Sequence, residues 1–330
     1  MDFSFTAEQD ALRASAREVL TKEAGPASYR AVMDGPTGTS EALWTTIGSL
    51  GWTGAAISES SGGLGLGLIE LVVLQEELGR ALAPAPFFST VCHAAVLADA
   101  AGGGADFLAR VAAGEVRASV ASGPHDTAVP DAHLADALVV VDGGSVYLAE
   151  SGAFTATQRP SLDLCRRMSD VTVDLAAATR IGDLDAGARD RTAVLLAAEA
   201  VGICDAVLAR SVEHVREREQ FGRAIGSYQA ISHRLANMLA LTEMARSHTY
   251  NAAWCLEEGT PEGALAAASA KASAADAVRE VTTGGIQVHG GIGFTWEHDL
   301  HLYLRRGRFA ELFLGAAPVW RERIASLIAA

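Results

Sequence analysis

The sequence has few cysteines, and their spacing is uninformative. The four cysteines are widely separated, at Cys92, Cys165, Cys204 and Cys255. They form no Cys-x-x-Cys pair and no His/Cys cluster with metal-ligand spacing, which excludes the common zinc motifs. We expect them to be buried small hydrophobic residues in a reduced, cytoplasmic protein.

Positive charge is also scarce. The chain carries 26 Lys and Arg against 40 Asp and Glu, a net charge of −14, so it repels nucleic acid, and any anionic ligand must be held by local positive groups. Residues 1–4 lack the basic start of a signal peptide. The most apolar run, 193–209, contains Glu199 and Asp205 and is interpreted as a core helix rather than a membrane span.

Aromatic residues make up only 6% of the chain, whereas 49% is hydrophobic, with alanine prominent. This composition is typical of a helix-rich globular protein with two or three packed layers. Thr6 and Gln9 form a capping box that predicts a helix to about residue 22. Further helical patterns cover 41–50, ending at Gly51, and 69–82.

The glycines of residues 62–67 invite a dinucleotide-binding interpretation. The spacing does not match G-x-G-x-x-G, because Leu68 stands at the third glycine position and no convincing strand precedes the run. We therefore predict a tight loop that leads into the helix 69–82.

The periodicity divides the rest of the chain into a β-rich segment and a helical one. Short alternating runs at 116–122, 137–141, 146–149, 155–159 and 171–175 predict a small antiparallel β-unit. Helical patterns then cover 190–217, 227–258, 261–289, 296–305 and 317–328. The predicted units are an N-terminal helical domain (1–113), a middle β-domain (114–185) and a C-terminal helical bundle (186–330).

A charged turn separates the first two long helices. The pattern breaks at Gly222 and Gly226 and resumes after Ser227, which we expect to be the N-cap of the second helix. This places Arg218 at a helix end, where its guanidinium could hold phosphate groups through forked hydrogen bonds. The alternative is a solvated charge cluster with no ligand.

A glycine-rich run, 284–299, follows the third long helix. Gly290 and Gly291 leave bare backbone to which a ligand can come close. The alternative is a helix C-cap without a ligand. His289, His298 and His301 are interpreted as structural residues.

Three segments resemble the acyl-CoA dehydrogenase family. They are the run 218–226 (REQFGRAIG) with its continuation to residue 236, the run 284–299, and the N-terminal run 50–86. The resemblance implies a mainly α fold with a small middle β-domain and a C-terminal four-helix bundle, and FAD as cofactor. It also implies that this chain contacts the FAD held mainly by a neighbouring subunit, through Arg218, Phe221, Gln229, Gln287, Gly290 and Gly291.

Two family features are missing. The segment that packs on the flavin ring is not found, and the β-unit is short. The carboxylate that removes the substrate α-proton is also absent, since the matching positions hold Leu314 and Asn237. Glu311 lies one helical turn before Leu314 and is the fallback base, although we interpret it as a surface carboxylate.

The pattern resembles the short subunit of actinobacterial two-gene acyl-CoA dehydrogenases, several of which act on steroid side-chain CoA thioesters. The predicted function is FAD-dependent α,β-dehydrogenation of an acyl-CoA, carried out with a catalytic partner subunit and an electron-transfer flavoprotein-type acceptor. Two alternatives stay open: a self-sufficient homo-oligomer that uses Glu311, and a flavin-free structural subunit.

Overall fold

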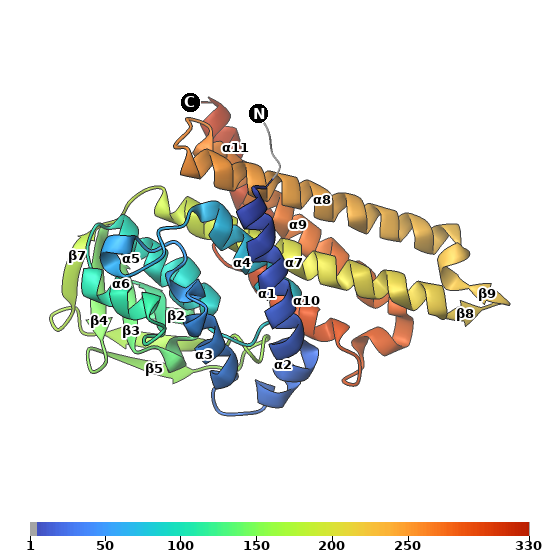
Figure 1. The fold of residues 1–330 in the computed structure, drawn as a ribbon, viewed down its shortest axis with the longest axis horizontal. Coiled ribbons are helices and arrows are strands. Elements are labelled where there is room, and N and C mark those ends of the chain that lie inside the picture. Colours follow the sequence, from blue (N-terminus) through green and yellow to red (C-terminus); the bar gives the residue numbers. More distant parts are fainter. Residues whose placement is uncertain (1–4, 330) are drawn as a thin grey trace.

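The computed structural model describes residues 5–329, so residues 1–4, on which the expectation about a signal peptide rests, lie outside the described part. Most of the β-strands gather on one side of the molecule, and long helices extend away from them toward the other (Figure 1). This arrangement is the mainly helical fold with a small β-domain that the sequence predicts.

The N-terminal part is helical. Its helices are α1 (Ala7–Glu23), α2 (Pro26–Met33), α3 (Glu41–Ser49), η1 (Trp52–Gly54), η2 (Glu59–Ser61), α4 (Leu68–Arg80), the π-helical η3 (Phe88–Ala95), α5 (Val96–Ala100) and α6 (Ala105–Ala112). The predicted capping box is confirmed: the Gln9 amide donates to Thr6 Oγ1 at 3.2 Å, and the Thr6 amide donates to Gln9 Oε1 at 3.0 Å. Gly51 follows α3 at φ +73°.

The glycine run 62–67 is a loop, as predicted, and residues 5–67 contain no strand. Gly67 is needed for close packing, because a Cβ at this position would lie 2.4 Å from the Glu257 carboxylate oxygens. That carboxylate accepts the Ile69 amide at the start of α4 at 3.0 Å. The end of the run therefore packs against α8 (Gln229–Glu257).

The β-unit consists of two small sheets. The first has the order β1 (Ala118–Ser122), β3 (Ala137–Asp142), β4 (Ser145–Glu150), β7 (Thr179–Asp183). The second has the order β2 (His125–Pro130), β6 (Met168–Val173), β5 (Phe154–Gln158), and a short helix, η4 (Ala132–Leu134), follows β2.

The prediction of a purely antiparallel unit is wrong for one pair. β1 and β3 run parallel, in register from Ala118 opposite Ala137, because the chain crosses to the other sheet as β2 before it returns. The strands β2 and β7 were not predicted, since their sequences are mostly polar and show no clear alternation.

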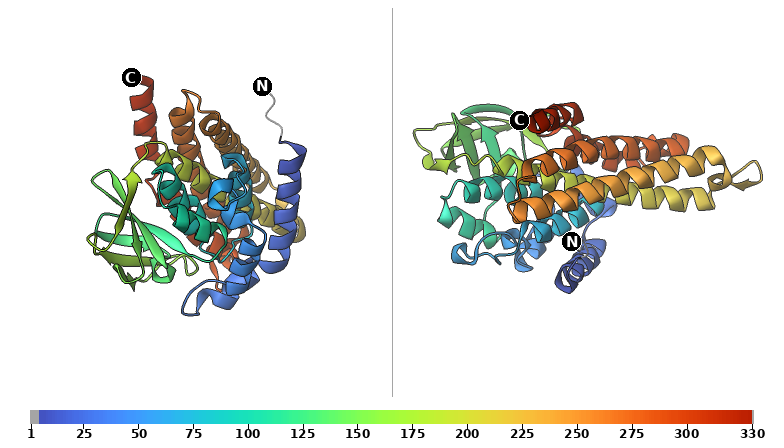
Figure 2. Two further views of the ribbon diagram at one scale, coloured as in Figure 1. Left: turned by 60° about the vertical axis from the view of Figure 1, so that its left-hand side comes forward. Right: turned by 90° about the horizontal axis from the view of Figure 1, so that it is seen from above.

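The C-terminal part is a bundle of long helices that run side by side (Figures 1 and 2). It contains α7 (Ala188–Glu217), α8 (Gln229–Glu257), α9 (Gly263–His289), η6 (Gly290–Phe294), α10 (Leu300–Leu312) and α11 (Ala317–Ala329). In α7, the window long and apolar enough to cross a membrane is 89% buried inside the fold. The interpretation of this stretch as a core helix is confirmed.

The turn between α7 and α8 is a hairpin of two short strands, β8 (Glu219–Gln220) and β9 (Arg223–Ala224). A single 3-10 turn, η5 (Ile225–Ser227), follows. Ser227 is therefore not the N-cap of α8: its hydroxyl donates to the Ala224 carbonyl within that turn at 2.7 Å, and Tyr228 precedes the helix.

A buried network of charges joins the three parts of the chain. Arg306 of α10 pairs with Asp163, which follows β5, and lies 3.3 Å from Glu199 of α7. Arg166 donates to both oxygens of Glu199, at 2.7 and 2.8 Å, and the Tyr29 hydroxyl of α2 donates to Asp163 at 2.7 Å. The sequence analysis did not predict this network. Its one indication was Glu199, a charged residue within an apolar run that was expected to be buried.

Candidate functional site

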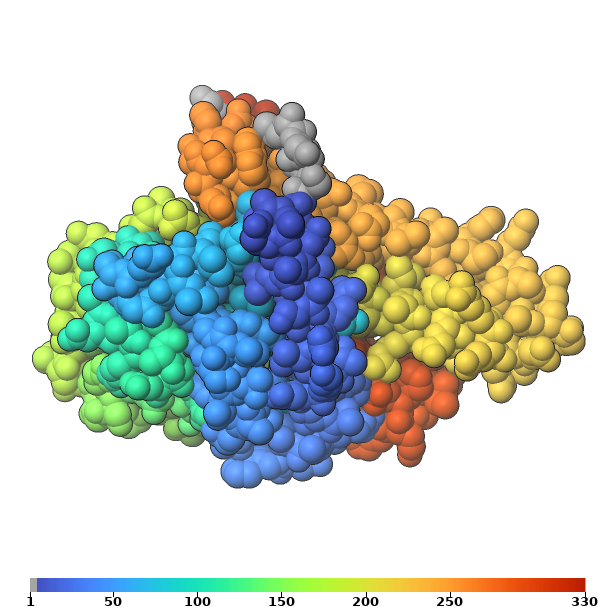
Figure 3. Space-filling view, in the orientation of Figure 1, coloured from blue at the N-terminus to red at the C-terminus, as the bar shows by residue number. Residues whose placement is uncertain are grey.

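One end of the bundle brings together the residues singled out in two separate sequence runs. The His214 ring, in the last turn of α7, stacks on the ring of His289, the last residue of α9, with centroids 4.1 Å apart. The β8–β9 hairpin therefore lies at the same end as the glycine-rich run after α9 (Figure 1). In the space-filling view this end projects from the rest of the molecule (Figure 3).

Arg218 caps the C-terminus of α7, where its amide donates to the His214 carbonyl at 2.9 Å. The residue is exposed, and its guanidinium makes no hydrogen bond or ion pair within residues 5–329. This open fork of donors can bind an anion from outside the chain.

Phe221 forms the tip of the hairpin. It has φ +53° and is followed by Gly222 at φ +80°. Two successive residues with positive φ are the requirement of a tight primed hairpin turn, but a bulky aromatic residue in this region is strained. Its side chain is 93% exposed. Strain together with exposure makes Phe221 a candidate functional position.

Gly290 and Gly291 leave the backbone bare where α9 ends. Gly290 has φ +64°, and a Cβ built at either glycine would meet nothing within 4 Å. The nearby side chains of Gln287 and Gln229 are exposed. This is open space beside exposed backbone and side-chain amides, which are groups that can donate to an anionic ligand.

The three histidines interpreted as structural lie at the same end of the bundle. The His289 imidazole is buried, and its Nδ1 lies 2.8 Å from the Gly285 carbonyl oxygen. The His298 ring lies 4.8 Å from the His289 ring, and the His301 ring packs 4.6 Å from that of Trp296.

Leu314 lies elsewhere, in the loop between α10 and α11. It has φ +61° and lines a cavity of about 370 Å³ between the β-unit, η3 and the first turns of α7. Arg189 donates to the Leu314 carbonyl oxygen at 3.2 Å. The Lys271 ammonium joins the end of α10 to this loop, because it donates to the carbonyl oxygens of Ala310 and Glu311, both at 3.0 Å, and of Gly315 at 3.2 Å.

Comparison with known proteins identifies the family. Residues 6–115 match the acyl-CoA dehydrogenase N-terminal domain, and residues 188–328 match the acyl-CoA dehydrogenase C-terminal domain. The acyl-CoA dehydrogenase IpdE2 of Mycolicibacterium smegmatis is 34% identical over 309 residues, which cover 93% of this chain and 94% of the relative. The chain belongs to the acyl-CoA dehydrogenase family.

Two solved structures show similar chains. One is a variant of the Tcur3481-Tcur3483 steroid ACAD, with a TM-score of 0.88 and 28% identity over 98% of each chain. The other is the ChsE4-ChsE5 complex from Mycobacterium tuberculosis, with a TM-score of 0.91 and 25% identity over 100% of this chain and 99% of the other. FAD is the cofactor of this family.

Acyl-CoA dehydrogenase chemistry requires a base, and neither matching position supplies one. Leu314 has no titratable group, and Asn237 lies on α8, where it lines a different cavity of about 340 Å³ between α8 and α9. The two positions are therefore not alternatives for one base within residues 5–329. From α7, Arg189 and Thr192 share the cavity of Leu314, and the Thr192 hydroxyl donates to the Ala188 carbonyl at 3.1 Å.

Glu311 is not a surface carboxylate, so that interpretation is wrong. The residue is only 7% exposed, and its carboxylate pairs with Arg308 at 2.6 Å. It does not line the cavity of Leu314. The helix α10 ends at Leu312. Glu311 is therefore still part of this helix, and its carboxylate pairs with a residue of the same helix rather than with the loop that holds Leu314.

Polar groups line part of the cavity beside Leu314. Its carboxylate, Asp126, accepts the amides of Ser122 and Thr127, both at 2.7 Å, so these two backbone donors are already used. Burial lowers the pKa of His93, which also lines the cavity, to about 3, so this imidazole is neutral at pH 7. The Arg189 guanidinium also faces the cavity and has donors beyond the one used by the Leu314 carbonyl oxygen.

Aromatic rings close the interior next to this cavity. The rings of Phe88 and Phe309 lie 5.7 Å apart, and the Phe313 ring stacks on Phe309 at 4.7 Å. The Arg166 guanidinium lies over both Phe88 and Phe309, at 5.1 and 4.6 Å. Sequence reasoning did not find this aromatic cluster, whose members are distant in the chain.

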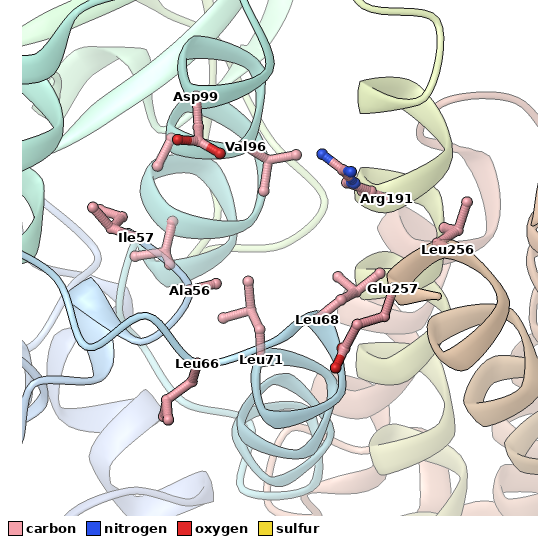
Figure 4. A pocket seen from close by; sticks show the side chains of 12 residues that line it. Ala56, Ile57, Leu66, Leu68, Leu71, Val96, Asp99, Arg191, Leu256 and Glu257 are labelled. Atoms are coloured by element: carbon pink, nitrogen blue, oxygen red, sulfur yellow. The ribbon is translucent and has the colours of Figure 1, made fainter. Parts of the chain in front are cut away.

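A further cavity, of about 200 Å³, lies between the loop 56–66, α4, α5 and the end of α8 (Figure 4). Aliphatic side chains line most of it, and Asp99, Arg191 and Glu257 stand around it. It contains none of the residues predicted to contact FAD or to replace the base.

Proposed function

We propose that this chain is the cofactor-completing, base-lacking subunit of a heteromeric acyl-CoA dehydrogenase that performs α,β-dehydrogenation of an acyl-CoA. One contrast carries the proposal. The bundle end presents open donors at Arg218 and at Gly290–Gly291, whereas the chain's own cavity has Leu314 where the family has its base.

In this reaction FAD accepts the hydride that leaves the substrate Cβ while a carboxylate removes the α-proton. The present chain would hold the pyrophosphate of a cofactor seated in the partner subunit. Arg218 would neutralise its charge, and the amides after α9 would donate to it. Local positive charge is needed because the chain as a whole carries −14.

Exposed apolar side chains around the bundle end support a partner subunit there. Phe221 is 93% exposed, Phe294 70%, Trp296 55% and Ile292 51%. These side chains flank the open donors on two adjacent loops, and apolar clusters of this kind mark protein interfaces. The similarity to the ChsE4-ChsE5 complex supports the same conclusion.

The proposed substrate is a bulky acyl-CoA of the steroid side-chain type. This proposal rests on the similarity to a steroid ACAD at 28% identity, and the described side chains do not specify an acyl group. We further propose that an electron-transfer flavoprotein-type protein accepts the electrons and that the enzyme is cytoplasmic. The proposed domains are residues 1–113, 114–185 and 186–330.

The test is a flavin spectrum of the chain purified alone and of the chain co-purified with its partner subunit. We expect no stoichiometric FAD in the chain alone and one FAD per pair of chains in the complex. Stoichiometric FAD in the homomeric protein would favour the self-sufficient enzyme. If the partner binds FAD entirely by itself, the complex with Arg218→Ala should have the same FAD affinity and activity as the wild type. That result would favour the flavin-free structural subunit.

A further inference from the structure

Three imidazole rings lie against one another at the base of the loop that carries Gly290 and Gly291. We call residues 290–299, between α9 and α10, the glycine arm. The His214 and His289 rings are stacked, with centroids 4.1 Å apart and planes 20° apart, and the His298 ring lies 4.8 Å from His289. Among residues 5–329 no cluster of His, Cys, Asp or Glu is placed to hold a metal ion, so this stack needs another explanation.

The stack connects both ends of the glycine arm to α7. His289 is the residue immediately before the arm, and His298 is the last but one residue within it. Ring contact between them closes the arm into a loop, and His214 ties this loop to the helix that Arg218 caps. The rings therefore set the position of the arm relative to Arg218.

One of the two hydrogen bonds made by these rings, that of His298, requires a neutral ring, whereas the Nδ1–H donor of His289 is present in both the neutral and the charged imidazole. The Nδ1–H group of His289 donates to the Gly285 carbonyl oxygen at 2.8 Å. The Nδ1 atom of His298 accepts the Leu300 amide at 3.3 Å, at the start of α10. Because an acceptor nitrogen carries no proton, protonation of His298 would place one donor against another and break this contact.

Positive charge surrounds the stack. The charged groups that face it are Arg210, Glu217 and Arg218 from α7, Arg30 from α2, and Asp299 from the arm. Arg30 donates to Asp299 at 3.0 Å, and Arg210 lies 3.7 Å from the same carboxylate, so Asp299 is already shared by two arginines. Burial and the arginines disfavour a proton on these rings, and Glu217 and Asp299 offset this effect only in part.

We propose that His214, His289 and His298 are positioning residues for the cofactor: stacked and neutral, they hold the glycine arm in its binding shape, and acid releases it. The link to FAD rests on the proposed function. The stacking and the hydrogen bonds concern this chain alone.

The direction of the pH effect follows from burial. Burial is the main cause that lowers the pKa of His289, to about 4, and it also lowers the pKa values of His214 and His298 from 6.5. The stabilisation is complete above pH 6.5 and is lost as the pH falls toward 4. For a group that shifts from 6.5 to about 4, the arm becomes roughly tenfold easier to open between pH 7.5 and pH 5.5.

The test measures hydrogen exchange of the arm amides in the full chain, corrected for the intrinsic pH dependence of exchange. The wild type should lose about tenfold protection in residues 290–299 between pH 7.5 and pH 5.5. The double variant His289→Asn with His298→Asn keeps a donor and an acceptor at the two Nδ1 positions but cannot be protonated there. In this double variant, the protection of residues 290–299 should fall by less than about threefold over the same pH range. His125→Asn, on the exposed β2, is the control and should behave as the wild type.

The same proteins, assembled with the partner subunit, give FAD affinity at both pH values. We expect wild-type FAD binding to weaken about tenfold at pH 5.5 and binding by the double variant to change little. Equal wild-type protection of the arm at both pH values would overturn the positioning role, whatever FAD does. An arm that opens while FAD affinity stays constant would instead refute the proposed function and leave the pH-dependent arm intact.

Discussion

Glu311 and Leu314 are three residues apart in the sequence, yet their side chains lie in different environments. The Glu311 carboxylate pairs with Arg308 along α10 at 2.6 Å, whereas Leu314 lines the cavity between the β-unit and α7. A carboxylate at 311 therefore does not stand in for one at 314, and the family's base has no replacement on this loop.

The first prediction is that Glu311→Gln leaves the turnover of the assembled enzyme nearly unchanged. Loss of a positioned general base costs roughly 10²–10⁴ in rate, so the expected change of less than about threefold is decisive. Steady-state kcat of the complex is the measurement, with Glu322→Gln, exposed on α11, as the matched control. An inactive Glu311→Gln complex that still holds FAD would make this chain catalytic.

The second prediction concerns Arg218. Arg218→Ala should weaken FAD binding to the complex by about 2–3 kcal/mol, because the anion loses a charged hydrogen-bond donor. Arg279→Ala, a half-exposed arginine that pairs with its helix neighbours on α9, should have no such effect. Fluorescence titration with FAD measures both. Equal FAD affinities of the wild-type and Arg218→Ala complexes would show that Arg218 is a solvated charge at a helix end with no ligand.

The third prediction separates stability from assembly at Phe221. Phe221→Gly and Phe221→Asn both tolerate the positive φ of the hairpin tip, so the unfolding free energy of the free chain should stay the same or rise by up to about 1 kcal/mol. Both variants remove an aromatic side chain that is 93% exposed, and they should weaken association with the partner. Urea unfolding and analytical ultracentrifugation measure the two effects, and unchanged association would place Phe221 outside the interface.

Much of the helical architecture could be predicted because its signals are local. Capping at Thr6, the end of α3 at Gly51, and the long amphipathic patterns of α7, α8 and α9 depend on residues a few positions apart. The same locality explains the error at Ser227. A serine just before a helical pattern has the composition of an N-cap, but the preceding hairpin continues into a 3-10 turn that uses its hydroxyl.

The remaining features depend on contacts between distant segments. The parallel pairing of β1 with β3 is decided by where β2 goes, and the side chains of β2 and β7 show no alternation that would indicate strands. The closing of the cavity interior by Phe88, Phe309 and Phe313 joins η3 to α10. For the candidate site, the sequence indicated the runs at the bundle end, but not the histidine stack that links them.

The last prediction tests the buried charge network. Asp163→Asn should destabilise the chain by roughly 3–5 kcal/mol, because it leaves the buried Arg306 without its main partner. The half-exposed pair of Arg159 and Asp170 provides the control, and Asp170→Asn should cost less than about 1 kcal/mol. Urea unfolding at pH 7 measures both variants. A loss of less than about 1 kcal/mol for Asp163→Asn would show that the network is relaxed or hydrated in solution.

The pH dependence of stability gives an independent check of the role of Asp163. Burial favours a higher pKa for Asp163, but the nearby Arg306 and Arg166 outweigh it and hold the pKa below its usual 3.8. The ionised carboxylate therefore contributes its full stabilisation above pH 3.8, and this contribution is lost as the pH falls through the lowered value. The gap between the wild type and Asp163→Asn should be constant from pH 7 to about pH 5 and should narrow only at lower pH.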